Sequence, residues 1–180
     1  VVFVGAVGDD TFALELRQAL VDAEVDAERL REVEGPSGVA VITVDDDGQN
    51  SIVVAPGANA LVADPTDAEL RAVAGADVLL CQLEIPLDTV TAAARHASRH
   101  GTVVMLNPSP ARSLPAELIE AVDVLVVNET EERQLGEDTL ARVAHVVTTL
   151  GADGARYRGP QGERVHVDSP TVDAIDTTGA

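Results

Sequence analysis

Polar side chains follow four apolar segments of strand length, at the point where each segment ends. They are Gln82 with Glu84, then Asn107, then Asn128 with Glu131, and finally Thr149, which Gly151 follows two residues later. In open α/β sheets, ligands bind where strands end and loops begin, so the set predicts one site at a common sheet edge. Each position also has a simpler interpretation, in which the residue only caps the helix that follows. Asn128 and Glu131, three residues apart, are equally typical of such a cap.

The acidic residues of this set suit different ligands. Glu84 lies in Gln-Leu-Glu-Ile-Pro, where a carboxylate can accept hydrogen bonds from hydroxyls such as those of a carbohydrate; a solvated loop acid is the alternative. Asn128 and Glu131 share one helical face, and the helix N-terminus there favours an anion such as a phosphate. Because a bare carboxylate repels phosphate, Glu131 would act through water or Mg²⁺.

Two glycine-containing segments would let the backbone approach a ligand closely. Residues 149–154, Thr-Leu-Gly-Ala-Asp-Gly, follow a strand, but the chain has no Lys, which excludes the phosphate-binding loop that ends in Gly-Lys-Ser/Thr. Residues 176–180, Asp-Thr-Thr-Gly-Ala, would expose free amides to an anion if a helix began there. His96 and His100 form an i, i+4 pair, which is interpreted as a solvated helix face because no third metal ligand is near in sequence.

Strand and helix patterns alternate along most of the chain. Strands are predicted over residues 1–7, 77–83, 102–106, 122–127 and 145–150, and helices over 9–23, 67–73, 87–100, 115–121 and 129–135. This alternation predicts a parallel sheet covered by helices on both faces. Two hairpins interrupt it, one pairing residues 38–44 with 51–55 and the other pairing 155–158 with 163–167. The first is interpreted as a small β flap beside the α/β body.

Composition narrows the function classes further. The net charge is −19, with 31 acidic and 12 basic residues, and such a surface repels nucleic acid and anionic lipid. No apolar stretch reaches the ~18 residues that span a membrane. The only cysteine, Cys81, is interpreted as a core residue, and a chain without an internal disulfide is expected in the cytoplasm. No Gly-x-Gly-x-x-Gly follows the first strand, which argues against a dinucleotide-binding dehydrogenase.

These segments together resemble the ribokinase family of carbohydrate kinases. Seven follow the family's order, at residues 7–10 (Val-Gly-Asp-Asp), 37–40 with 55–59, 82–86, 106–112, 128–131, 149–151 and 176–180. The resemblance covers essentially the whole chain. It implies a three-layer α/β/α fold with a mostly parallel central sheet and a small β lid. Residues 1–180 would form a single incomplete domain, with the lid hairpin over residues 36–59.

The resemblance implies separate sugar and nucleotide residues. Glu84 would bind a sugar hydroxyl, and Ala40 and Ile52 of the lid would cover the apolar face of the sugar. On the nucleotide side, Asn128 would contact the ATP phosphates and Glu131 would help to hold Mg²⁺ through water. The remaining ATP-binding residues would be Thr149, Gly151 and Gly154.

The last residues of the chain would carry a cation and an anion hole. By resemblance, Asp176 and Thr178 would belong to a monovalent cation (K⁺) site, and Gly179 and Ala180 would begin the anion hole. The catalytic base, in a Gly-Asp step, is expected beyond Ala180, and a glycine-rich sugar-binding block is expected before Val1.

The activity implied by the resemblance is transfer of the ATP γ-phosphate to the 5-hydroxyl of D-ribose, with Mg²⁺ and K⁺ as cofactors. Residues 1–180 alone are expected to be inactive, because the base lies outside them. Two alternatives remain open: another sugar or nucleoside kinase of the same fold, and a non-catalytic sugar-binding module. A homodimer through the β lid is expected, because the lid strands carry apolar edges that need cover. The alternative is that the segment expected before Val1 covers these edges instead.

Overall fold

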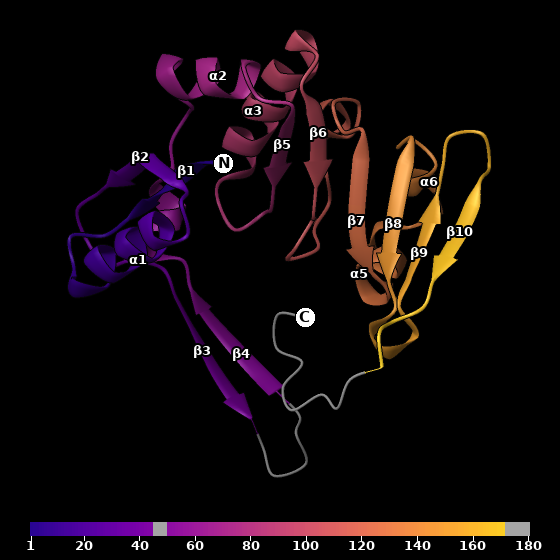
Figure 1. The fold of residues 1–180 in the computed structure, drawn as a ribbon, viewed down its shortest axis with the longest axis horizontal. Coiled ribbons are helices and arrows are strands. Elements are labelled where there is room, and N and C mark those ends of the chain that lie inside the picture. Colours follow the sequence, from indigo (N-terminus) through magenta and orange to yellow (C-terminus); the bar gives the residue numbers. More distant parts are fainter. Residues whose placement is uncertain (45–49, 172–180) are drawn as a thin grey trace. The chain divides into compact units, whose positions relative to one another are not determined.

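The computed structural model describes residues 1–44 and 50–171 (Figure 1). The chain divides into two compact units, and each is considered by itself. Unit 1 comprises Val1–Ala72 and Glu84–Ala93, and unit 2 comprises Val73–Leu83 and Ala94–Ala180. The cation site and anion hole predicted at residues 176–180 lie outside the described residues.

Unit 1 begins with a strand, a helix and a second strand. Strand β1 (Val2–Val7) pairs in parallel with β2 (Asp26–Glu32), and α1 (Thr11–Asp22) connects them. Helix α1 begins at Thr11, two residues later than predicted, because Asp10 is its N-cap and its carboxylate accepts a hydrogen bond from Ala13 N. A small core of Val7, Ala13, Ala27 and Leu30 holds the three elements together.

An antiparallel ribbon follows in the same unit. Strands β3 (Val39–Val44) and β4 (Asn50–Ala55) pair from Val39↔Ala55 to Val44↔Asn50. The predicted hairpin is therefore confirmed, and in Figure 1 it projects away from α1, β1 and β2. The short 3₁₀ helix η1 (Gly57–Leu61) and helix α2 (Asp67–Ala74) come next along the chain.

Unit 2 is built on a six-stranded sheet with the order β10-β9-β8-β7-β6-β5. Its strands are β5 (Val78–Cys81), β6 (Val103–Leu106), β7 (Val124–Asn128), β8 (His145–Thr149), β9 (Ala155–Arg158) and β10 (Arg164–Val167). Strands β5 to β8 are parallel, and β9 and β10 add an antiparallel hairpin to the edge. The α/β class with a mostly parallel sheet and a small antiparallel ribbon is confirmed.

Helices and turns connect these strands. They are α3 (Leu87–His100), α4 (Ala116–Ile119), α5 (Glu129–Leu135), α6 (Glu137–Leu140) and the 3₁₀ turn η2 (Gly151–Asp153). Helix α3 buries Val90, Ala94 and Ala97 along one side, which is the spacing of an amphipathic helix. It ends at Gly101, whose φ of 80° is the left-handed conformation that glycine adopts readily.

The core of unit 2 is aliphatic. Fully buried side chains of Val104, Leu106, Leu118, Leu125 and Val127 fill it. Burying one such side chain contributes roughly 1.5–3 kcal/mol, so this cluster fixes the sheet without aromatic residues. Cys81 ends β5, and burial raises the pKa of its thiol to about 11. The thiol is therefore neutral at pH 7, as expected of a packing residue.

Besides the 3₁₀ turns η1 and η2, the structure contains two elements that were not predicted, β2 and α6. Strand β2 was not predicted, because charged residues dominate its sequence and only Ala27 and Leu30 are buried. Helix α6 is a single turn of four residues, too short for a periodic signal. Among residues 1–44 and 50–171, no helix is both long and apolar enough to cross a bilayer.

Candidate functional site

The carboxyl ends of β6, β7 and β8 meet at one edge of the sheet of unit 2. Asn128 lies directly opposite Thr149 in the parallel register of β7 and β8. Asn107, which follows β6, donates its Nδ2 hydrogen to the carbonyl of Val126 at 2.9 Å. The structure therefore brings the predicted polar residues of unit 2 together along this edge.

Asn128 and Glu131 form a complete capping box at the start of α5. Asn128 Oδ1 accepts hydrogen bonds from the backbone N–H groups of Thr130 at 3.0 Å and Glu131 at 2.9 Å. In return, Glu131 Oε2 accepts one from Asn128 N at 2.9 Å. The cap interpretation of these residues is confirmed, and the cap holds both side chains in fixed positions at the sheet edge.

Glu131 is the residue here that could serve a cation. Its side chain is buried, with 8% of the residue exposed. Within the described part of the chain, its Oε1 atom takes part in no hydrogen bond, so one carboxylate oxygen remains for water or a metal. Among the described residues, no three or more His, Cys, Asp or Glu side chains are grouped so that they could hold a metal ion. One carboxylate nonetheless fits Mg²⁺, which keeps several waters and takes its other ligands from phosphates.

The two glycines of the turn after β8 have different surroundings. Gly151 has φ +58° and nothing within 4 Å of a Cβ placed on it, so its backbone is open to an approaching ligand. A Cβ on Gly154 would overlap the Val167 carbonyl oxygen. Gly154 is therefore required by the packing of the chain itself, and the case for nucleotide contact rests on Thr149 and Gly151.

The predicted sugar-binding residues all belong to unit 1. Ala40 pairs with Val54 and Ile42 with Ile52, so Ala40 and Ile52 lie on the same face of the β3–β4 ribbon. Both are exposed, and Ile52 keeps 49% of its surface accessible. Glu84 is also exposed. The sugar set and the nucleotide set thus occupy different units.

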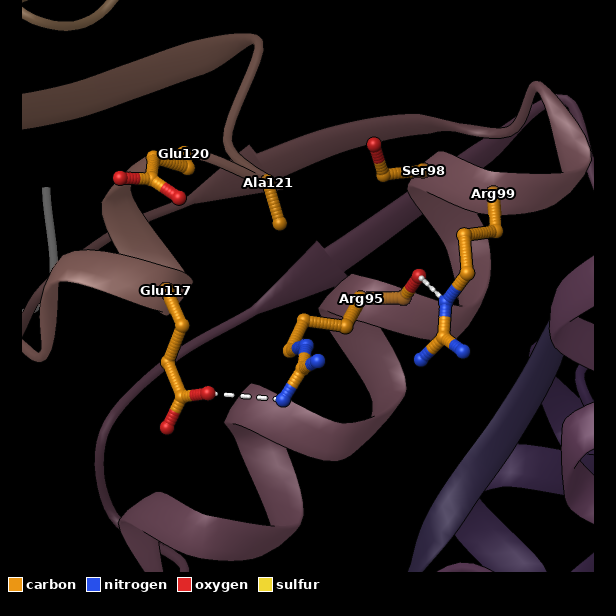
Figure 2. Close-up of a pocket in the computed structure, with 6 residues that line it drawn as sticks. All are labelled: Arg95, Ser98, Arg99, Glu117, Glu120 and Ala121. Atoms are coloured by element: carbon orange, nitrogen blue, oxygen red, sulfur yellow. Dashed lines mark hydrogen bonds and ion pairs between the residues drawn. The ribbon is translucent and has the colours of Figure 1, made fainter.

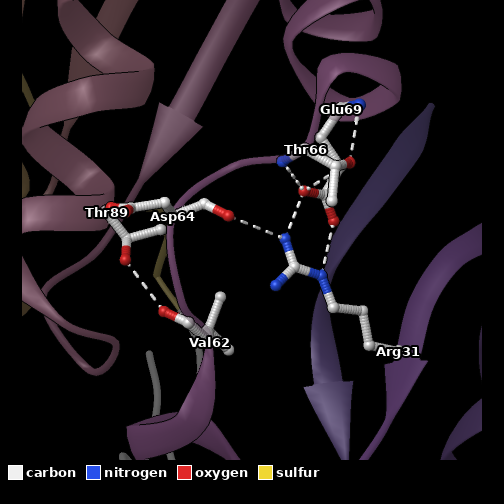
Figure 3. Close-up of polar contacts among 6 residues, drawn as sticks. All are labelled: Arg31, Val62, Asp64, Thr66, Glu69 and Thr89. Carbon is white, nitrogen blue, oxygen red and sulfur yellow. Dashed lines mark hydrogen bonds and ion pairs between the residues drawn. The ribbon is translucent and has the colours of Figure 1, made fainter.

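A buried polar network in unit 1 was not predicted. Arg31 of β2 donates hydrogen bonds from Nε to Glu69 Oε1 at 2.8 Å and from Nη2 to Glu69 Oε2 (Figure 3). Glu69 also accepts from Thr66 N at 2.7 Å, and Glu69 N donates to Thr66 Oγ1 at 3.3 Å. The Thr-x-x-Glu spacing is a capping-box signal, so the cap was visible in the sequence although its Arg31 partner was not.

A shallow groove in unit 2 carries charges of both signs. It is lined by Arg95, Ser98, Arg99, Glu117, Glu120 and Ala121 (Figure 2). Arg95 pairs with Glu117 at 2.7 Å, and Arg99 Nε donates to the Arg95 carbonyl at 3.0 Å. Since the charges are largely paired, the groove offers no concentrated field for a charged ligand. None of its residues belongs to the predicted site.

Similarity to known proteins agrees with this geometry. The profile of the pfkB family of carbohydrate kinases matches residues 1–180. Ribokinase of Schizosaccharomyces pombe is 34% identical over 98% of the chain and 62% of the relative. The ATP-dependent ribose-1-phosphate kinase of Halopiger xanaduensis is 36% identical over 98% of the chain and 62% of that protein.

A solved structure extends the similarity to the fold. Ribokinase of Arabidopsis thaliana, complexed with ribose and ATP, superimposes with a TM-score of 0.89 at 29% identity, covering 99% of this chain and 64% of that one. The chain thus belongs to the pfkB family of carbohydrate kinases. It spans slightly less than two thirds of the length of these relatives.

Proposed function

We propose that the whole protein transfers the γ-phosphate of ATP to the 5-hydroxyl of D-ribose. The observation that carries this proposal is the Asn128–Glu131 capping box, fixed at the sheet edge opposite Thr149. A buried carboxylate, one oxygen of which has no hydrogen bond within the described residues, and an open glycine turn at Gly151 together suit a metal–phosphate group. Similarity to proteins named ribokinase supports ribose as the acceptor.

The residues of unit 2 would position the nucleotide. Asn128 would contact ATP phosphates, and Thr149 and Gly151 would line the nucleotide site, with Gly154 allowing the turn that presents them. Glu131 would hold a water of the metal shell, and Mg²⁺, when bound, would neutralise charge on the phosphates. In unit 1, Glu84 would accept a hydrogen bond from a sugar hydroxyl, which orients the attacking oxygen.

The ribbon of unit 1 would cover the sugar. Ala40 and Ile52 present an apolar surface on one face, and such a surface suits the carbon face of a ribose ring. Closure would exclude water, which otherwise competes with the sugar hydroxyl for the γ-phosphate. We further propose that Asp176 and Thr178 bind K⁺ beside an anion hole begun by Gly179 and Ala180.

The opposite face of the ribbon would contact a second copy of the protein. Val41 and Val53 pair on that face and are 57% and 67% exposed. A thin ribbon with apolar side chains on both faces needs two partners. We propose the sugar for one face and the equivalent ribbon of a second copy for the other, which gives a homodimer.

The test is ADP release by the whole protein, including any sequence that adjoins residues 1–180. Ribose, ribose 1-phosphate, 2-deoxyribose, fructose and adenosine are compared with Mg²⁺ and K⁺ present. Preferential turnover of ribose is expected, and Glu131→Gln should lower it sharply. Preferential turnover of another acceptor would identify that compound, and not ribose, as the substrate. Sugar binding without any turnover would favour a non-catalytic binding module. Residues 1–180 alone should show no turnover, because the catalytic base is expected beyond Ala180.

A further inference from the structure

The β3–β4 ribbon is joined to unit 1 through one buried serine. Ser37, only 2% exposed, lies two residues before β3. Its Oγ donates to Asp10 Oδ1 at 2.8 Å and accepts from Gly8 N at 2.9 Å. Its backbone N–H donates to Asp10 Oδ2 at 2.8 Å. Ser37 thus ties the ribbon to the turn between β1 and α1.

Backbone hydrogen bonds close the same junction on both sides. Asp9 N donates to the Gly35 carbonyl at 3.0 Å, and Gly35 N donates to Asp9 Oδ1 at 3.0 Å. Ala58, just after β4, donates to the Pro36 carbonyl at 2.9 Å. The chain entering the ribbon and the chain leaving it are therefore held at one point.

Glycines let these segments approach closely. A Cβ on Gly8 would overlap the Gly35 carbonyl oxygen. A Cβ on Gly57 would lie 2.5 Å from the Pro36 carbonyl oxygen, and Gly57 has φ +48°. The junction therefore has no spare volume, in contrast to the ribbon, where every residue of β3 is exposed. We call this junction, at residues 8–10, 35–37 and 57–58, the root of the ribbon. The ribbon depends on its root for orientation, because its own side chains are exposed.

We propose that Asp10 and Ser37 are positioning residues that fix the direction and rigidity of the β3–β4 ribbon. The inference rests on the proposed function, in which this ribbon covers the sugar. Asp10 serves two elements at once, because Oδ1 also accepts from Ala13 N at 3.1 Å and so caps α1. The carboxylate couples the first turn of α1 to the root of the ribbon.

The charge state of Asp10 agrees with this role. Hydrogen bonds from the backbone and hydroxyl of Ser37 hold the pKa of the Asp10 carboxyl below its ordinary value of 3.8. The group is therefore a carboxylate at neutral pH, and both of its oxygens can accept hydrogen bonds.

Ser37→Ala is the sharpest variant. It removes the hydroxyl that links Gly8 to Asp10 and leaves the backbone bond of Ser37 and the cap at Ala13 in place. Thr89→Val is the matched control. Thr89 is buried in the same unit, and within the described residues its hydroxyl has one partner, the Val62 carbonyl, at 2.8 Å. Asp10→Asn is the second variant: it keeps the size of the side chain but loses one acceptor oxygen.

The first measurement is hydrogen–deuterium exchange of the Val39–Val44 amides in the 180-residue chain. Ser37→Ala and Asp10→Asn should each speed this exchange about tenfold, because the root opens more easily. Thr89→Val should leave it within about twofold of the unmodified chain. Unchanged exchange in both Ser37→Ala and Asp10→Asn would overturn the proposal, whatever the enzyme assay shows.

The second measurement uses the whole protein. Ser37→Ala should raise the KM for the sugar and the ratio of ATP hydrolysed to sugar phosphorylated, with the KM for ATP unchanged. Faster exchange with unaltered sugar KM and coupling would also overturn the positioning role. Absence of turnover in the unmodified whole protein would instead reject the proposed kinase function, and the exchange result would still decide whether Asp10 and Ser37 hold the ribbon.

Discussion

Glu69 is a buried carboxylate whose charged form is stabilised by hydrogen bonds from three donor groups. It is 3% exposed and receives hydrogen bonds from Arg31 of β2 and from the backbone and hydroxyl of Thr66 (Figure 3). Arg31 also donates to the carbonyl of Asp64 at 3.4 Å. The pair links β2 to the first turn of α2, so its loss would affect the packing of two elements.

Replacing Glu69 should therefore destabilise the protein strongly. Glu69→Gln is expected to lower the free energy of unfolding by about 3 kcal/mol, because Arg31 would be left without its counter-charge. The control is Glu117→Gln, which breaks the exposed pair with Arg95, whose side chains are 55% and 49% accessible. That change should cost less than about 1 kcal/mol. Equal losses in urea unfolding would contradict the ranking.

The same carboxylate should make stability depend on pH. Burial disfavours the charged form of Glu69, but the hydrogen bonds from Arg31 and Thr66 outweigh burial and lower its pKa from the ordinary 4.5. The unfolded chain therefore takes up the proton first. The contribution of Glu69 is complete above pH 4.5 and is lost as the pH falls towards the folded pKa.

Urea unfolding of the unmodified protein and of Glu69→Gln between pH 7 and 3 measures this contribution. The difference between them should be constant at neutral pH and should shrink below about pH 4.5. Other acidic groups are present in both proteins and cancel in the difference. A gap that widened on acidification would show that the pKa of Glu69 is raised in the folded state.

Residue types and spacing predicted local contacts well and distant ones poorly. Asn128 and Glu131 are three residues apart, so their mutual hydrogen bonds follow from the geometry of one helical turn. Arg31 and Glu69 are 38 residues apart, and no local pattern brings them together. The contacts of Ser37 with Asp10 were missed for the same reason, because they depend on how β1 and the ribbon meet.

At the scale of elements, the turn between β8 and β9 depends on one glycine. Gly154 has φ +87°, and an added Cβ would overlap the carbonyl oxygen of Val167. Gly154→Ala should cost about 2 kcal/mol or more, since it combines backbone strain with a clash that only backbone movement relieves. The loss would appear in thermal or urea unfolding of the 180-residue chain.

Gly162 provides the matched control. It has φ +85° but no atom within 4 Å of an added Cβ, so Gly162→Ala carries the strain without the clash. It should cost about 1 kcal/mol, because an L side chain is disfavoured in the left-handed region. Equal effects of the two substitutions would mean that backbone strain alone explains the requirement for Gly154.

Elements with a strong apolar period were predicted more accurately than those without one. The bounds of α3 and α5 match the predicted ranges, because α3 has buried residues at helical spacing and α5 begins at a recognisable cap. Strand β2 was missed, because five of its seven residues are charged and only Ala27 and Leu30 are buried. Its pairing with β1 supplies the order that its own composition lacks.

At the scale of the whole molecule, the ribbon faces impose separate demands on assembly and catalysis. The register places Val41 and Val53 on one face and Ile42 and Ile52 on the other, and all four are exposed. A change on either face alters apolar area by a similar amount. The two faces can therefore be tested separately, with each variant serving as the control for the other.

Val53→Glu should abolish the proposed homodimer while leaving sugar affinity largely intact in the resulting monomer. A charge at the centre of an apolar contact is costly when it is buried without a partner. Ile52→Glu should have the opposite effects: it should raise the KM for the sugar, while the protein still sediments as a dimer. Sedimentation velocity at micromolar concentration, with sugar kinetics on the same samples, distinguishes the two. A protein that is monomeric before any substitution would refute the dimer, and loss of assembly in Ile52→Glu alone would exchange the roles of the two faces.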